Sequence, residues 1–123
     1  MARKIDKKEA IFILNKMIKL AKLRGEMTKV TYEKSTSYAN HGRYDASSVE
    51  NAIDIAESFV IKTNHQGNSA RVLVSVYAMK EDGWLCQRTI DVQSPFNGKR
   101  NSIGYALPDE NRLDEADFSD WGC

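Results

Sequence analysis

The sequence predicts an α+β domain in which an amphipathic N-terminal helix packs on a mainly antiparallel sheet of four or five strands. Three observations support this prediction: an apolar pattern of helical period near the N-terminus, a β-hairpin pattern in mid-chain, and a length suited to one domain. The chain has 123 residues, of which 41% are hydrophobic and 28% charged, as in ordinary globular proteins. We therefore expect one domain over residues 1–108, followed by an acidic, aromatic tail over residues 109–123.

The N-terminal helix is predicted to span about residues 7–24. Asp6 and Glu9 have the spacing of a capping box at its start, and Gly25 stands where a left-handed cap ends many helices. The apolar residues between these caps recur at intervals of three and four, which places them on one face. They are Ala10, Ile13, Leu14, Met17, Leu20 and Ala21.

Two strands are predicted from short patterns outside the hairpin. In residues 27–35, Val30 and Tyr32 alternate with polar residues, which indicates a half-buried strand. Residues 103–107 suit an edge strand, and Pro108 would end it because proline cannot donate to a sheet ladder.

The hairpin prediction covers residues 70–92. Valines alternate through residues 70–79, and Asp82-Gly83 supplies the positive-φ position that a tight turn needs. Residues 84–92 form the return strand. Strict alternation along this strand predicts one shared face for four side chains: Trp84, Cys86, Ile90 and Val92.

Residues 37–63 give weaker signals. Residues 37–45 are polar, contain Gly42 and predict a loop. Apolar residues in the segment 48–57 keep helical spacing, although a strand there also fits the pattern. The apolar run Phe59-Val60-Ile61 favours a strand over residues 58–63, so we expect a short helix followed by that strand.

Charge is distributed unevenly along the chain. Residues 1–34 contain ten Lys or Arg against four acids, residues 35–105 contain seven of each, and residues 106–123 contain one base against six acids. The basic and acidic ends could pair between chains, so homo-oligomers are compatible with the sequence. The apolar stretches are too short to cross a bilayer and the basic start leads into a charged helix, so we expect a cytoplasmic protein without membrane contact.

Catalytic and metal-binding patterns are absent from the sequence. His41 and His65 both fall in polar, loop-like segments, and no nucleophile, metalloprotease or EF-hand motif accompanies them. Cys86 and Cys123 form no C-x-x-C pair. We expect no catalytic residues, no metal and no cofactor, and an enzyme is the least favoured of the function classes.

The tail suggests a binding function. Acidic side chains steer a partner electrostatically, and the aromatic rings among them anchor in a pocket. The residues expected to bind a protein partner are Asp114, Glu115, Asp117, Phe118, Asp120 and Trp121. Packing of the tail on the basic helix, or a disordered solubilising end, are the competing interpretations.

Two loops suggest an alternative function, the binding of single-stranded nucleic acid or a nucleotide. Aromatic rings stack on bases while cations neutralise phosphates. The residues with this character are Tyr38, Arg43, Tyr44, Phe96, Lys99 and Arg100. The net charge of +1 is low for a dedicated nucleic-acid binder.

The sequence therefore predicts, first, a small non-enzymatic protein that binds a protein partner. By analogy with the anti-CRISPR-like inhibitors of phages and mobile elements, that partner would be a nucleic-acid-handling complex of host defence. The nucleic-acid-binding module is the alternative.

Overall fold

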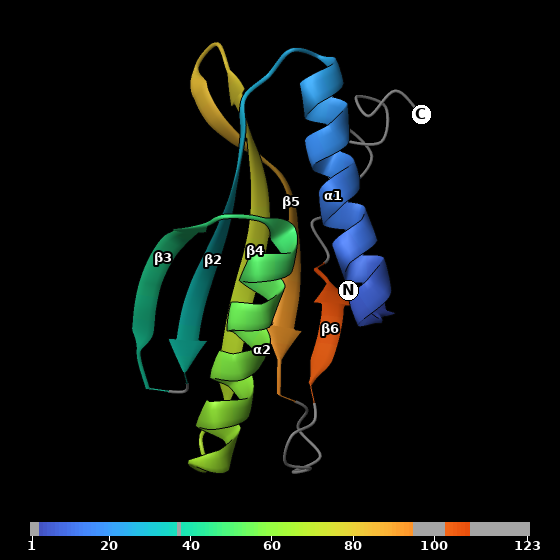
Figure 1. Cartoon of the computed structure of the whole chain (residues 1–123). Coiled ribbons are helices and arrows are strands. Elements are labelled where there is room, and N and C mark those ends of the chain that lie inside the picture. The colour runs from blue at the N-terminus through green and yellow to red at the C-terminus, as the bar shows by residue number, and fades with distance from the viewer. Residues whose placement is uncertain (1–2, 37, 95–102, 109–123) are drawn as a thin grey trace.

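The computed structural model describes residues 3–36, 38–94 and 103–108. All strands belong to one antiparallel sheet, ordered β1-β6-β5-β4-β2-β3. The elements are β1 (Arg3–Ile5), α1 (Lys7–Leu23), β2 (Thr28–Thr36), β3 (Asn40–Ala46), α2 (Val49–His65), β4 (Ala70–Lys80), β5 (Gly83–Gln93) and β6 (Gly104–Leu107). Both helices lie across the same face of the sheet, α1 over β4, β5 and β6 and α2 over β4 and β2 (Figure 1). The predicted α+β fold is confirmed, with six strands in the sheet.

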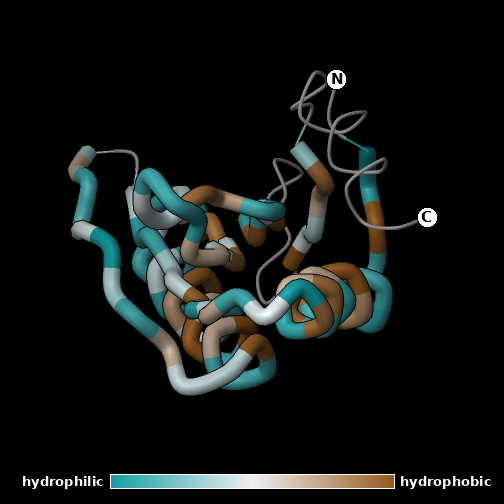
Figure 2. Tube along the Cα trace, turned by 90° about the horizontal axis from the view of Figure 1, so that it is seen from above, coloured by the Kyte–Doolittle hydropathy of each residue, from teal (hydrophilic) through white to brown (hydrophobic). Residues whose placement is uncertain are grey.

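The hydrophobic core lies between the two helices and the sheet. Figure 2 shows hydrophobic segments of both layers where they face each other. The largest side chains that are fully buried there come from both helices and from β4 and β5: Leu14, Met17, Ile53, Val60, Val72, Val74, Val76, Ile90 and Val92. Removing this apolar surface from water supplies the main driving force for the fold.

Helix α1 begins and ends as its sequence predicts. The Asp6 carboxylate accepts a hydrogen bond from the backbone N–H of Glu9 at 2.7 Å, which caps the first turn. Gly25 has φ +77°, and the backbone N–H groups of Gly25 and Glu26 donate to the carbonyls of Lys22 and Ala21. These two bonds form a Schellman motif, in which glycine avoids the steric cost of a left-handed residue.

Helix α2 is a single helix of 17 residues, so the predicted strand over residues 58–63 is wrong. The buried positions of α2 recur every three or four residues to its end: Val49, Ala52, Ile53, Ala56, Val60 and Thr63. In the run Phe59-Val60-Ile61 only Val60 is fully buried, while its neighbours are half-buried. A three-residue apolar run fits one helical turn as well as a strand, and helix-to-sheet packing selects the helix.

Two further predictions need correction, and one strand was missed. Residues 37–45 are not a loop throughout, because β3 pairs with β2 in antiparallel register, for example Tyr32 with Tyr44. Strand β1 was not predicted. It pairs with β6, so β6 lies between β5 and β1 and is not the expected edge strand. In each case pairing with another strand decides the structure, and the local sequence pattern does not reveal that pairing.

Residues 95–102 and 109–123, which include the predicted tail, lie outside the described residues. Neither described helix combines the length and the apolarity needed to cross a bilayer.

Candidate interaction face

The two faces of the sheet differ in character because successive residues of a strand point to opposite sides. We call the side under the helices the helix face and the other side the open face. On the central strand β4, Val72, Val74 and Val76 point to the helix face and are fully buried. Leu73 and Tyr77, which alternate with these valines, point to the open face and are half-buried.

Four side chains form an aromatic–cationic cluster on the open face: Lys29, Arg43, Tyr77 and Trp84. The sheet register brings these side chains together. Tyr77 on β4 lies opposite Lys29 on β2, and Met79, two residues further along the same face of β4, lies opposite Trp84 on β5. The Lys29 Nζ lies 4.6 Å from the centroid of the Trp84 ring and 5.8 Å from that of Tyr77. Both distances are within the range of cation–π attraction.

Arg43 completes the cluster from the edge strand β3. Its guanidinium carbon lies 5.8 Å from the centroid of the Tyr77 ring, and its Nη2 lies 3.5 Å from Glu33 Oε1. Burial is the largest influence on the Tyr77 phenol and raises its pKa above that of a free tyrosine. The Trp84 side chain stays accessible, with 38% of its surface exposed.

A β-bulge in β5 decides that Trp84 belongs to this cluster. Arg88 pairs with Val76 and Cys86 pairs with Tyr77, so Gln87 is an extra residue without a partner on β4. One extra residue reverses the alternation of the strand. The prediction that Trp84, Cys86, Ile90 and Val92 share a face is therefore wrong. Trp84 and Cys86 lie on the open face, whereas Ile90 and Val92 lie in the core.

Hydrogen bonds from α1 and the β4–β5 hairpin hold the bulge. The Arg24 Nη2 donates to Gln87 Oε1 at 3.2 Å, and Gln87 Nε2 donates to the Leu85 carbonyl at 3.0 Å. Glu26 pairs with Arg24 at 3.0 Å and with Lys80 at 2.6 Å. The hydrogen bonds from Arg24 and then from Lys80 lower the pKa of the Glu26 carboxyl.

Small polar side chains run across the centre of the open face. Thr31 and Ser75 are buried, and Ser75 Oγ lies 2.7 Å from Thr89 Oγ1 in a hydrogen bond. The Cys86 Sγ lies 3.4 Å from the same Thr89 oxygen. Because these side chains are short, the larger rings and cations around them stand higher above the sheet and are the first groups that a partner would meet.

A second aromatic group lies on the helix face, beside α2. The Lys34 Nζ lies 5.2 Å from the ring centroid of Phe59 and 5.5 Å from that of Tyr44. The Tyr44 hydroxyl donates to the His41 carbonyl, and the His41 ring stands edge-on to Phe59. This group connects β3 with α2 through the contact of His41 with Phe59, and Tyr44 remains 49% exposed.

His41 lies in this packing group and not in a polar loop as predicted. Its Nε2 lies 3.2 Å from Thr36 Oγ1, and its ring also contacts Tyr38. No described carboxylate hydrogen-bonds to the His41 imidazole. The pairing of a base with an orienting acid, which general-base catalysis needs, is therefore missing at His41 within the described part of the chain.

The residues predicted for nucleic-acid binding do not form one surface where they are described. Arg43 and Tyr44 are neighbours on β3 and point to opposite faces, and Tyr38 lies 67% exposed between β2 and β3. Phe96, Lys99 and Arg100 lie outside the described residues, as do all six residues predicted to bind a protein partner. Sequence reasoning did not select Lys29, Tyr77 and Trp84. The apolar character of both faces of residues 70–79 was a signal for Tyr77 alone.

Neither a metal site among the described residues nor a match to a known protein gives further information on function. No group of three His, Cys, Asp or Glu side chains able to hold a metal ion exists among the described residues. Comparisons of the chain with protein-family models, curated proteins and solved structures find no match. A functional proposal therefore depends on the open face itself.

Proposed function

We propose that the protein is a binding protein that docks a protein partner on the open face of its sheet. The observation that carries the proposal is the aromatic–cationic cluster, which stands on the side of the sheet that neither helix covers. An ordinary solvent-facing sheet surface carries polar residues. This one carries two aromatic residues on adjacent strands, Tyr77 on β4 and Trp84 on β5.

The composition of the open face is typical of protein interfaces. Tyr, Trp, Met and Arg are enriched in interface cores, and Trp, Tyr and Arg supply most binding hot spots. The open face provides Trp84, Tyr77, Met79 and Arg43 within one region of β3, β4 and β5. These side chains favour a partner with an apolar patch that covers the two rings.

The charges specify the partner further. Lys29 lies over the aromatic rings and forms no ion pair with any described carboxylate. A partner that carries a carboxylate beside its apolar patch would supply this missing counter-charge, and would gain speed and specificity of association from it.

The same charges argue against the nucleic-acid alternative on this face. Two of its cations are already neutralised, Arg43 by Glu33 at 3.5 Å and Arg71 by Asp91 at 2.8 Å. A phosphate backbone would have to compete with both carboxylates. The open face therefore favours a protein over a nucleic acid.

The finer proposals from the sequence concern the partner and the tail. One proposal is that the protein inhibits a nucleic-acid-handling defence complex in the cytoplasm. Its support is the analogy with anti-CRISPR-like inhibitors and the opposed charges of the two chain ends. Docking by the tail residues is a separate proposal, which deletion of residues 109–123 tests directly.

The test of the open face compares two neighbouring residues of β5 that point to opposite sides. Trp84→Ala removes the ring from the open face, whereas Leu85→Ala removes an exposed apolar side chain from the other side. Affinity capture from a lysate of the source cells, followed by mass spectrometry, identifies proteins held by the wild type. Binding of a captured protein is then measured by calorimetry with each variant.

We expect Trp84→Ala to weaken that binding about 30-fold, since truncating a hot spot costs about 2 kcal/mol, and Leu85→Ala to leave it unchanged. Equal losses in both variants, or none in Trp84→Ala, would contradict docking on the open face. Tight binding of a single-stranded oligonucleotide that weakens steeply with salt would instead establish the alternative function.

A further inference from the structure

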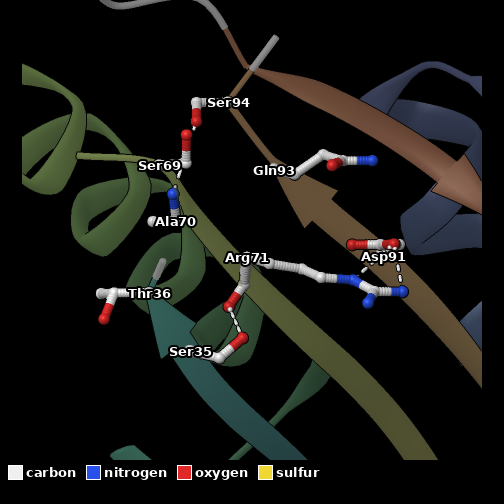
Figure 3. A pocket seen from close by; sticks show the side chains of 8 residues that line it. All are labelled: Ser35, Thr36, Ser69, Ala70, Arg71, Asp91, Gln93 and Ser94. Carbon is white, nitrogen blue, oxygen red and sulfur yellow. Dashed lines mark hydrogen bonds and ion pairs between the residues drawn. The ribbon is translucent and has the colours of Figure 1, made fainter. Parts of the chain in front are cut away.

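A pocket of about 410 Å³ opens at the end of the sheet where β2 and β5 end and β4 begins. Figure 3 shows the guanidinium of Arg71 meeting the carboxylate of Asp91 on one side of this pocket, with Gln93 beside them. Four hydroxyl side chains line the remainder: Ser35, Thr36, Ser69 and Ser94. Its volume lies in the range of small-molecule sites.

Asp91 uses only one of its two oxygens in contacts with the described residues. The Arg71 Nε donates to Oδ2 at 2.8 Å, and Arg71 Nη2 lies 2.8 Å from the same Oδ2. The other oxygen, Oδ1, is buried and has no hydrogen-bond partner among the described residues. Asp91 as a whole is only 6% exposed. An unsatisfied buried carboxylate oxygen is costly, so Oδ1 is an acceptor that lacks its donor.

The charges of the described residues that line the pocket cancel. Arg71 and Asp91 neutralise each other, and the other lining side chains are uncharged. The Arg71 side chain is 52% exposed, and its Nη1 donates to no described residue. The described residues therefore offer an acceptor, Asp91 Oδ1, and N–H groups of the Arg71 guanidinium that no described partner uses, and their charges do not favour an ion.

We propose that this pocket binds a small neutral molecule through an amide edge in which N–H and C=O lie on the same side. The N–H donates to Asp91 Oδ1, and the C=O accepts from the Arg71 guanidinium. Uracil-type pyrimidine rings, other lactams and primary carboxamides present such an edge. A trans peptide group does not, because its N–H and C=O point in opposite directions.

Because Oδ1 is buried, the proposal requires a side chain of the wall to move, and Gln93 is the candidate. The Gln93 side chain lies beside the carboxylate in Figure 3 and makes no hydrogen bond to a described residue. Rotation of this side chain would break no hydrogen bond of the described structure.

The pocket is distinct from the aromatic–cationic cluster. Arg71 and Tyr77 are six residues apart on β4, which corresponds to about 20 Å. Ligand binding here does not depend on the proposed docking of a protein, and each proposal can fail without the other.

The test uses two probes that differ in a single donor. Uridine carries an N–H flanked by C=O groups, and 3-methyluridine replaces that hydrogen with a methyl group. Nicotinamide and N,N-dimethylnicotinamide form the equivalent pair for a carboxamide. Each probe is titrated into the ¹⁵N-labelled full-length protein, and the backbone amide shifts of Arg71, Asp91, Gln93 and Ser94 are followed.

We expect at least one unmethylated probe to shift these amides, and its methylated counterpart to bind about tenfold more weakly, the value of one hydrogen bond. Equal binding of both members of each pair would overturn the proposal, and so would shifts confined to other parts of the protein or no binding up to millimolar concentration.

Protein variants provide the second arm. Asp91→Asn should weaken binding of the unmethylated probe, because its amide disturbs the arrangement that Arg71 imposes on Oδ1. Asp45→Asn, a change on the edge strand β3, is the matched control and should leave binding unchanged. If Asp91→Asn does not fold, the probe pairs on the wild-type protein still decide the question.

Discussion

The two faces of the sheet are made by the same strands and have opposite characters. On β4 and β5 the helix face presents Val72, Val74, Val76, Ile90 and Val92, all fully buried against α1 and α2. The open face of the same strands presents aromatic rings, hydroxyls and one thiol, with charged groups near its ends. The helix face buries apolar side chains throughout, whereas the chemical character of the side chains on the open face changes from residue to residue.

This difference indicates how stability and recognition are divided. The helix face supplies the packing that fixes both helices, so its side chains have little freedom to change. The open face contributes less to burial and can carry side chains chosen for contact with other molecules. Substitutions should therefore separate into those that unfold the protein and those that alter binding.

The largest effect is expected from truncation in the core. Ile90→Ala should lower the free energy of unfolding by about 2–5 kcal/mol, because Ile90 is fully buried and its removal leaves a cavity. Leu73→Ala, a similar truncation on the open face, should cost about 1 kcal/mol. Urea denaturation of both variants measures the contrast. Equal losses would show that the open face carries as much of the stability as the helix face does.

A smaller effect is expected at the bulge. Gln87→Ala removes the side-chain hydrogen bonds to Arg24 and to the Leu85 carbonyl, and should cost about 1–2 kcal/mol. Trp84 emission should also change, since the bulge sets the face on which the indole lies. Gln93→Ala on the same strand is the control and should change the stability by about 0.5 kcal/mol or less. An unchanged Gln87→Ala protein would mean that the sheet register alone maintains the bulge.

The ion pairs beside the bulge predict a modest dependence on pH. The folded-state pKa of Glu26 is lowered by Arg24 and Lys80, so its contribution is present above the ordinary value of 4.5 and is lost as the pH falls through the folded value. We expect Glu26→Gln to cost up to about 1 kcal/mol at pH 7 and less at pH 3. Glu81→Gln, in the exposed hairpin turn, is the control. Urea unfolding of both variants at pH 7 and pH 3 measures the difference. Equal changes in the free energy of unfolding for the two variants would contradict this account.

The smallest effect concerns the Tyr77 phenol at alkaline pH. Burial raises its folded-state pKa above that of a free tyrosine, so the stability it contributes is present below the free value and is lost as the pH rises through the folded value. In a titration followed by tyrosinate absorbance, Tyr77→Phe should remove a late-titrating component. Tyr38→Phe, which removes one phenol at an exposed position, is the control. Loss of the same component in both variants would place Tyr77 in a more solvated setting than the structure gives it.

The elements that could be predicted from sequence have strong local signals. Helix α1 has a repeating apolar stripe, a terminal glycine and the Asp6 half of the predicted capping box, whereas the Glu9 side chain pairs with Arg3. The β4–β5 hairpin has alternating apolar residues and an Asp-Gly turn. Local hydrogen bonds and local periodicity are enough to specify such elements.

The elements that were missed lack such signals. Strand β3 is polar and contains Gly42, and it is a strand because β2 offers it a ladder. Strand β1 has three residues, and its partner β6 lies a hundred residues away along the chain. The bulge at Gln87 leaves no mark in the alternation of β5, so the placement of Trp84 could not be derived from spacing.

The sequence alone determined the α+β class, helix α1, the central hairpin and the uneven distribution of charge, because each depends on neighbouring residues. Tertiary structure decided the six-stranded order, the length of α2 and the surfaces proposed for binding. The cluster of Lys29, Arg43, Tyr77 and Trp84 draws on four strands, and the pocket at Arg71 and Asp91 lies where three strands terminate. Such sites depend on strand pairing and on one extra residue in β5, since a shift of one residue exchanges the two faces of a strand.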